Sequence, residues 1–227
     1  MLTTLLRHGL SEFLGTLFLV AGIGGATMMA YSNGGGLIEV AAAGGFTLAL
    51  FTTAFAAYGA QFNPAITIAL LFTRRIKTSI AGLHLGAQVA GGIAGAYLLK
   101  VLYPIVVFDA TRGGGTIIST DVPAVQAWGL EFVGGFLLMF AYYVALIDKR
   151  TTRLGGLPVG FAAAVILMMM APLTGASMNP ARTLGPMIAS GILEGLVIFA
   201  TAPLVGAVVA ALVYEHVVLD KGTDAAS

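Results

Sequence analysis

The tripeptide Asn-Pro-Ala occurs twice in the chain, as Asn63-Pro64-Ala65 and as Asn179-Pro180-Ala181. Asparagine is a favoured N-cap and proline is favoured in the first turn, so each copy predicts a helix that begins at the motif. The N-terminus of a helix presents unpaired backbone N–H groups and roughly half of a positive elementary charge. Such a site holds oxygen atoms of neutral molecules and repels cations and protons.

A charged residue follows the second motif directly. Arg182 lies in an apolar segment, where an arginine at the centre of an isolated membrane helix costs at least ~2.5 kcal/mol. Its presence therefore indicates a cavity or a polar partner.

The segments that follow the two motifs are too short to cross a membrane. Residues 65–72 end at Thr73-Arg74-Arg75, and residues 181–188 are followed by Ser190-Gly191. A helix of about ten residues is ~15 Å long, which is half of the hydrocarbon thickness. Irregular backbone at that depth is tolerated only when it is buried in protein or lines a water-filled cavity. We therefore predict two re-entrant half-helices.

Composition identifies the solvent in which these elements must fold. The chain is 58% hydrophobic and 9% charged, whereas soluble domains have about 25% charged residues. The net charge of +1 and the lack of a basic stripe argue against nucleic acid as a partner, and there are no cysteines. Apolar stretches of membrane-spanning length predict six spans near 10–31, 38–58, 80–103, 127–147, 157–174 and 194–218.

A second repeated segment indicates an internal duplication. Glu12-Phe13-Leu14-Gly15 opens the first span and Glu131-Phe132-Val133-Gly134 opens the fourth. Each half, about 10–103 and about 127–218, contains three spans, so the second half must be inverted in the membrane. We predict an all-α membrane protein with six transmembrane helices and two re-entrant half-helices, forming a single channel domain over 1–227. Inversion would bring the two half-helix N-termini together near the midplane.

The two repeated glutamates admit two interpretations. Carboxylates inside a membrane suggest a proton relay by default. Their equivalent positions favour a structural role, in which Glu12 and Glu131 accept backbone N–H bonds from the two re-entrant loops. In the third span, the pairs Gly82/Gly86 and Gly91/Gly95 predict two faces of close helix packing. Lys100, near the end of that span, could extend to the lipid headgroups.

Positive residues gather on one side of the predicted topology, which makes that side cytoplasmic and places both termini there. We expect an integral multi-pass protein, of a bacterial-type inner or plasma membrane. The residues are Arg7, Arg74, Arg75, Lys77, Lys149, Arg150, Arg153 and Lys221.

The segment from Thr174 to Arg182, the two Glu-led openings and the stretch from Ala202 to Ala207 resemble the aquaporin or major intrinsic protein family over about residues 10–218. The resemblance implies a homotetramer with one pore per subunit, passive conduction and no cofactor. It also implies a selectivity filter formed by Arg182, Leu167, Ala176 and Ala43. For Ala43, a slip of one residue would give Ala42 or Gly44, and a slip of three would give Phe46.

These filter residues favour a wide opening. Water-selective members of the family resemble one another in placing a histidine where this chain has Leu167, and a bulky aromatic residue where it has Ala43. Glycerol facilitators carry an aspartate where this chain has Thr183. We expect a channel for water and small uncharged solutes such as polyols, urea or metalloid hydroxides. The alternative is a strictly water-selective aquaporin.

Two other classes of membrane protein, secondary transporters and enzymes, fit the sequence less well. Secondary transporters also use inverted repeats and broken helices, but the pore segments offer no unpaired carboxylate for ion coupling beyond the two repeated glutamates. An enzyme is not expected, because the spans contain no Ser/His, Asp-pair or metal-binding constellation. His84 and the run Met168–Met170 fit core packing better than metal ligation, so no metal site is predicted.

Overall fold

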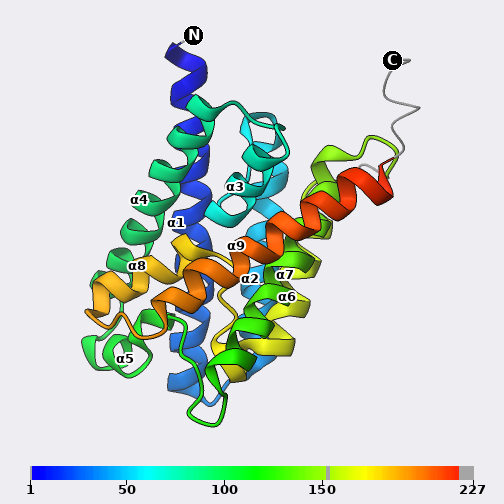
Figure 1. The fold of residues 1–227 in the computed structure, drawn as a ribbon. Coiled ribbons are helices and arrows are strands. Elements are labelled where there is room, and N and C mark those ends of the chain that lie inside the picture. Colours follow the sequence, from blue (N-terminus) through cyan, green and yellow to red (C-terminus); the bar gives the residue numbers. More distant parts are fainter. Residues whose placement is uncertain (1, 152–153, 220–227) are drawn as a thin grey trace.

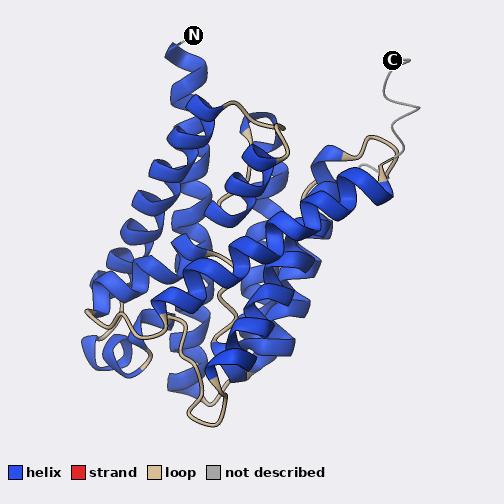
Figure 2. Ribbon diagram, viewed as in Figure 1, coloured by secondary structure: helices blue, strands red, loops and turns tan. Residues whose placement is uncertain are grey.

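The computed structural model describes residues 2–151 and 154–219, so Arg153 and Lys221, counted above for orientation, lie outside the described residues. Over these ranges the chain forms helices and loops without a strand (Figure 2). Six helices are long and apolar enough to cross a membrane. They are α1 (Leu2–Asn33), α2 (Leu37–Phe55), α4 (Thr78–Leu102), α6 (Ala124–Tyr142), α7 (Leu157–Thr174) and α9 (Leu196–Val213).

Two further helices have half of that length. They are α3 (Pro64–Phe72) and α8 (Pro180–Ser190), and each begins at the proline of its motif. The prediction of six spans and two half-helices is confirmed. The first helix begins at Leu2 and not near residue 10, because residues 2–10 contain no proline and continue the helical turn. The short helix α5 (Ile105–Ala110) lies in the connection between α4 and α6.

The two halves pack in equivalent ways. In the first half α1 packs along α4, and in the second half α6 packs along α9, while α2 contacts α7 across the halves. A Cβ atom built on Gly91 of α4 would lie 2.3 Å from the Phe13 carbonyl oxygen, and one on Gly206 of α9 would lie 2.0 Å from the Phe132 oxygen. Since Phe13 and Phe132 follow the repeated glutamates, the same close approach occurs in both halves.

Only one of the two predicted glycine faces on α4 is a packing face within the chain. Gly91 and Gly95 approach the backbone of α1, at Phe13 and Leu17. Apart from the adjoining turns of α4 itself, no atom of the described residues lies within 4 Å of a Cβ built on Gly82 or Gly86. The expectation of close packing at that second pair was therefore wrong within one protomer.

The half-helices approach each other from opposite edges of the bundle (Figure 1). In this view α3 lies in the upper part and α8 in the lower part, and α3 contacts α8. The beginning of α1 lies at the top and the end of the last helix lies at the right in the upper half, whereas α5 lies at the lower left. The last helix and α6 both end in a π-helical turn, at Tyr214–Val218 and Tyr143–Ile147.

Candidate functional site: opposed half-helices and an arginine constriction

Each half-helix is capped by the asparagine of its motif. The Asn63 Oδ1 atom accepts a hydrogen bond of 2.9 Å from the Ala65 N–H. The Asn179 Oδ1 atom accepts bonds of 3.0 and 3.2 Å from the N–H groups of Ala181 and Arg182. The proline of each motif occupies the first turn, where its missing N–H breaks no helical bond. The motifs thus perform the capping that their residue types predict.

The same asparagines join the two halves of the chain. Asn63 Nδ2 donates to the Met178 carbonyl oxygen at 2.8 Å, and Asn179 Nδ2 donates to the Phe62 carbonyl oxygen at 2.7 Å. Each bond crosses from one motif to the loop that precedes the other. Because an amide carries two N–H donors, one hydrogen of each asparagine remains for a solute. The crossed pair holds the two helix ends face to face.

The loops before the motifs have a repeated backbone conformation. The residues one and three places before each asparagine adopt positive φ angles, which are uncommon for residues other than glycine. This repetition orients the loop carbonyls for the crossed hydrogen bonds. The residues are Ala60 (51°), Phe62 (50°), Ala176 (48°) and Met178 (44°).

Glu12 fixes the first of these loops. Its carboxylate accepts hydrogen bonds from the backbone N–H of Gln61 at 2.8 Å and of Phe62 at 2.6 Å. The Gln88 side chain donates a third bond at 2.7 Å. Every partner here is a donor, so the ionised carboxylate satisfies all three without a proton of its own.

Glu131 makes the equivalent contacts in the second half. Its carboxylate accepts bonds from the N–H groups of Ser177 at 2.9 Å and Met178 at 2.8 Å, and from the Thr174 hydroxyl at 2.6 Å. Both glutamates are fully buried. Each one therefore stabilises a loop that contains two residues with positive φ.

A threonine four residues after each motif asparagine adds a second contact to the loop. Thr67 donates to the Gln61 side-chain oxygen at 2.7 Å, and Thr183 donates to the Ser177 hydroxyl at 2.7 Å. Thr183 also shares a hydrogen bond of 3.1 Å with Thr116 of the connection between α5 and α6. The shared spacing of the two threonines from their motifs is the sequence signal for this contact, whereas the comparison with glycerol facilitators considers Thr183 only in place of an aspartate.

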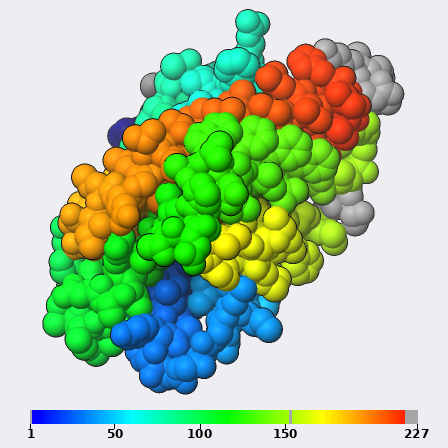
Figure 3. Space-filling model, turned by 60° about the horizontal axis from the view of Figure 1, so that its bottom comes forward, coloured from blue at the N-terminus to red at the C-terminus, as the bar shows by residue number. Residues whose placement is uncertain are grey.

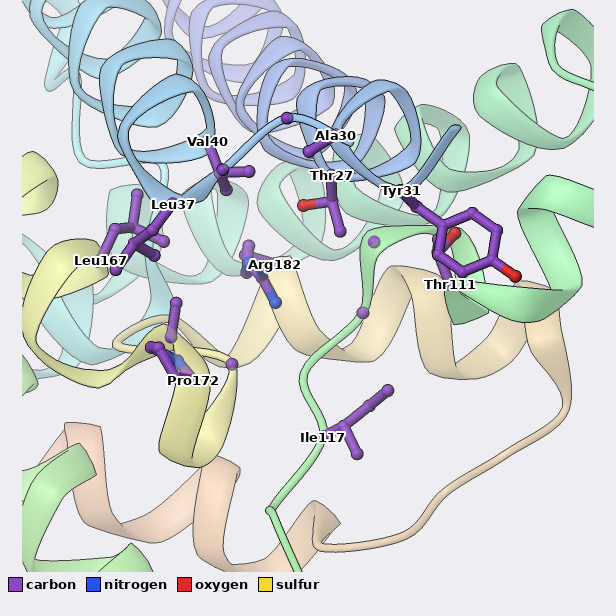
Figure 4. A pocket seen from close by; sticks show the side chains of 16 residues that line it. Thr27, Ala30, Tyr31, Leu37, Val40, Thr111, Ile117, Leu167, Pro172 and Arg182 are labelled. Atoms are coloured by element: carbon purple, nitrogen blue, oxygen red, sulfur yellow. The ribbon is translucent and has the colours of Figure 1, made fainter. Parts of the chain in front are cut away.

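Arg182 lies at the base of a vestibule of about 400 Å³ (Figure 4), which we call the outer vestibule because it opens at the turn between α1 and α2, at the opposite end of α1 from its beginning. The vestibule is lined by the ends of α1, α2 and α7 and by the connection after α5, with Thr27, Tyr31, Leu37 and Leu167 among its side chains. Figure 3 brings this face forward, with the blue α1–α2 corner, the green connection and yellow α7 meeting on it. Arg182 is 4% exposed, and its Nη1 atom has no hydrogen-bond partner among the residues that the structure describes. A buried donor of this kind is available to a solute oxygen.

The α2 side of this constriction is formed at Gly44. A Cβ atom built on Gly44 would lie 2.5 Å from Leu167 Cδ1, so Leu167 packs directly over this glycine. Val40 of α2 lines the vestibule and Leu48 lines the space below it, and Gly44, four residues from each, lies on the same helix face. Ala43 is rotated about 100° from Gly44, and Phe46 is 71% exposed. Among the positions left open by the sequence, Gly44 is the one that faces Leu167.

Below Arg182 a small chamber surrounds the two motif asparagines. Its volume is about 10 Å³, close to the least that holds one water molecule. Asn63, Asn179 and Arg182 supply its polar atoms, together with Gln61 and Ser177. The remaining wall is apolar, formed by Leu19, Ile23, Leu48, Leu138 and Met178. A molecule in this chamber meets polar atoms near the helix ends and aliphatic side chains elsewhere.

Comparison with known proteins agrees with this geometry. The family model described as "Major intrinsic protein" matches residues 2–214. The chain belongs to the major intrinsic protein family. It is 35% identical to "Aquaporin NIP6-1" of Arabidopsis thaliana, over 95% of this chain and 70% of that protein. It is 31% identical to "Probable aquaporin PIP2-8" of Oryza sativa, over 95% of this chain and 82% of that protein.

A solved structure supports the fold of this major intrinsic protein. The aquaglyceroporin from Plasmodium falciparum aligns with a TM-score of 0.83 and 23% identity, over 94% of this chain and 97% of that chain. The protein is thus an integral multi-pass membrane channel and not an enzyme. Because the sequence relatives named above are plant proteins, they give no support to the bacterial-type membrane that we expected.

The inner end of the path in this major intrinsic protein is polar. Gln61 lines both the chamber and an inner vestibule of about 240 Å³, together with His8, His84 and Arg75. His84 Nδ1 lies 3.0 Å from the Gln61 side-chain oxygen, and His84 Nε2 lies 3.2 Å from His8 Nδ1. Since an amide oxygen only accepts, Nδ1 of His84 carries the proton in this arrangement. The hydrogen-bonded packing role expected of His84 is what the structure displays.

The expectation that Lys100 extends to the lipid headgroups is not met. Its ammonium donates to the Ala189 carbonyl oxygen at 2.7 Å and lies 5.4 Å from the centre of the Phe108 ring. Ala189 is in the last turn of α8, where free carbonyls carry partial negative charge. The lysine therefore neutralises the outer end of α8 and leaves the positive end facing the chamber. Over the described residues, His, Asp and Glu side chains form no cluster that could hold a metal ion.

Proposed function

We propose that this protein conducts water and small uncharged solutes passively across a membrane and excludes protons and ions. The observation that carries the proposal is the Nη1 donor of buried Arg182, which has no hydrogen-bond partner among the described residues. It lies between the outer vestibule and a chamber that holds both motif asparagines. A permeating molecule receives hydrogen bonds from Arg182 and from the free amide hydrogens of Asn63 and Asn179. All three groups donate, so they select oxygen atoms with free lone pairs.

Exclusion of charge follows from the orientation of the half-helices. Each N-terminus contributes roughly +0.5 of an elementary charge, and Arg182 adds a full charge nearby. A cation in the chamber would meet this field with little water around it. A water molecule held by donors points its lone pairs at the protein, which interrupts proton transfer along a file of waters.

The solute range follows from the filter, which we assign to Arg182, Leu167, Ala176 and the α2 position, Gly44 in place of Ala43. Gly44 supplies no side chain and Leu167 is aliphatic, so the filter has one polar edge at Arg182. Such a filter suits polyols, urea or metalloid hydroxides. The specific observation that favours the alternative, a strictly water-selective aquaporin, is the chamber volume of about 10 Å³. A larger solute would have to displace the aliphatic side chains that line the chamber. Rotation of these side chains costs far less free energy than a movement of the backbone, so the small volume does not close the path to such a solute.

We further propose that both termini are cytoplasmic, that the halves 10–103 and 127–218 are inverted repeats in one channel domain, and that the protein is a homotetramer. The distribution of Lys and Arg supports the orientation, as do the beginning of α1 and the end of the last helix, which both lie in the upper half of Figure 1. The repeated Glu, Asn and Thr contacts support the inverted repeat.

Stopped-flow light scattering of proteoliposomes tests this proposal. Vesicles should shrink faster than empty liposomes in a sucrose gradient, and should re-swell in glycerol, urea or boric acid without any ion gradient. Shrinkage without re-swelling would favour the water-selective alternative. Uptake that saturates at low solute concentration and requires a proton or sodium gradient would indicate a secondary transporter.

A further inference from the structure

The α2 side of the constriction is filled by side chains of other helices. A Cβ atom on Gly44 would lie 2.5 Å from Leu167 Cδ1, and 3.0 and 3.3 Å from Ile23 Cγ1 and Cδ1. Leu167 belongs to α7 and Ile23 belongs to α1. The space that a side chain on α2 would otherwise take is therefore divided between two aliphatic residues.

These two residues face opposite sides of the constriction. Leu167 lines the outer vestibule, and Ile23 lines the chamber that contains the motif asparagines. Arg182 lines both spaces. A molecule passing Arg182 therefore meets Leu167 first and Ile23 next.

The backbone around Ile23 is held by close contacts on both sides. A Cβ atom on Gly22 would lie 2.6 Å from the Thr47 hydroxyl of α2. A Cβ atom on Gly24 would lie 2.7 Å from the Gly113 carbonyl oxygen in the connection after α5. The approach to the Gly113 backbone requires glycine at position 24, and the two contacts hold the α1 backbone beside Ile23 close to α2 and to the connection after α5.

We propose that Ile23 is a specificity-determining residue of the pore, which sets the size of the uncharged solute that can pass from Arg182 to the motif asparagines. This inference rests on the proposed channel function. Ile23 is one of five apolar side chains in the wall of the chamber of about 10 Å³, which is room for one water. It is the one of them that packs against the position where Gly44 supplies no side chain. Solutes larger than water pass when the Ile23 and Leu167 side chains rotate aside, so shortening Ile23 favours them over water.

The test compares two substitutions of Ile23 with a control substitution on the same helix, in proteoliposomes. Ile23→Ala should raise the ratio of glycerol to water permeability several-fold, and Ile23→Val should raise it by a smaller factor. Val20→Ala is the matched control, because Val20 is also buried on α1 but packs in a separate cluster with Met28 and Leu99. It should leave the ratio unchanged.

The outcomes separate this inference from the proposed function. If the wild type shows no flux above empty liposomes, the channel proposal fails. If the wild type conducts while Ile23→Ala and Val20→Ala give the same permeability ratio, only the role of Ile23 is refuted. Should Ile23→Ala fold poorly, Ile23→Val decides alone, since an unchanged ratio in that variant contradicts the inference.

Discussion

Replacing Glu131 by glutamine should destabilise the fold while leaving conduction by the remaining folded protein intact. The carboxylate accepts three hydrogen bonds, and a glutamine has one acceptor oxygen and an amide that donates. With its oxygen toward Thr174 and Ser177, the amide would face the Met178 N–H, which lies 2.8 Å from Glu131 Oε2. One charge-assisted bond is lost and a buried donor is left unpaired, so the free energy of unfolding should fall by roughly 2–4 kcal/mol.

Thermal or SDS unfolding in detergent micelles, followed by circular dichroism, measures this loss. Glu12→Gln should behave alike, because Glu12 accepts bonds from the N–H groups of Gln61 and Phe62. Glu39→Gln is the control: Glu39 is exposed and accepts one bond of 2.9 Å from Gly36, so its loss should cost less than about 1 kcal/mol. The reasoning is refuted if Glu131→Gln unfolds like the wild type and instead abolishes a pH-dependent flux, which would identify a proton relay.

Three further predictions concern the filter, the second loop and the inner surface. Leu167→His should reduce glycerol or boric acid flux more than water flux in stopped-flow assays, and an equal loss of both would show that the filter is misassigned. Thr183→Val removes the hydroxyl that forms hydrogen bonds with Ser177 and Thr116, so the free energy of unfolding should be about 1–3 kcal/mol lower than in the wild type. An unchanged unfolding midpoint would contradict this. The hydrogen bonds that Arg150 donates lower the pKa of the Asp148 carboxyl from 3.8 to about 2, so the stability that the ionised carboxylate adds is present above pH 3.8 and is lost as the pH falls through about 2. Asp148→Asn should remove that part of the acid dependence in a series of melting curves at different pH values. A series identical to that of the wild type would refute this prediction.

Residue types with strong local preferences made most of the fold predictable. Uninterrupted apolar length predicted the six spans, and the Asn-Pro pairs predicted where α3 and α8 begin. The duplication of the Glu-led segment predicted that Glu12 and Glu131 would occupy equivalent places. Each of these signals comes from a contiguous stretch of the chain or from the repetition of one, so these predictions need no knowledge of contacts between distant residues.

Features that depend on contacts between distant segments were harder to predict. The filter position on α2 depends on how this helix is rotated about its axis, because a shift of one residue, about 100°, exchanges Ala43 for Gly44. The crossed bonds from Asn63 to Met178 and from Asn179 to Phe62 join residues more than a hundred positions apart. The proposed role of Ile23 depends on the packing of α1, α2 and α7 against one another.

Proton flux in proteoliposomes tests the central claim most directly, that two opposed half-helix N-termini and Arg182 pass neutral molecules and reject charge. A pH-sensitive dye trapped inside the vesicles would report the flux after an acid jump, in a preparation whose water permeability exceeds that of empty liposomes. We predict a proton influx equal to that of empty liposomes at every protein density. A proton influx that rises in proportion to the density of the channel would contradict the account.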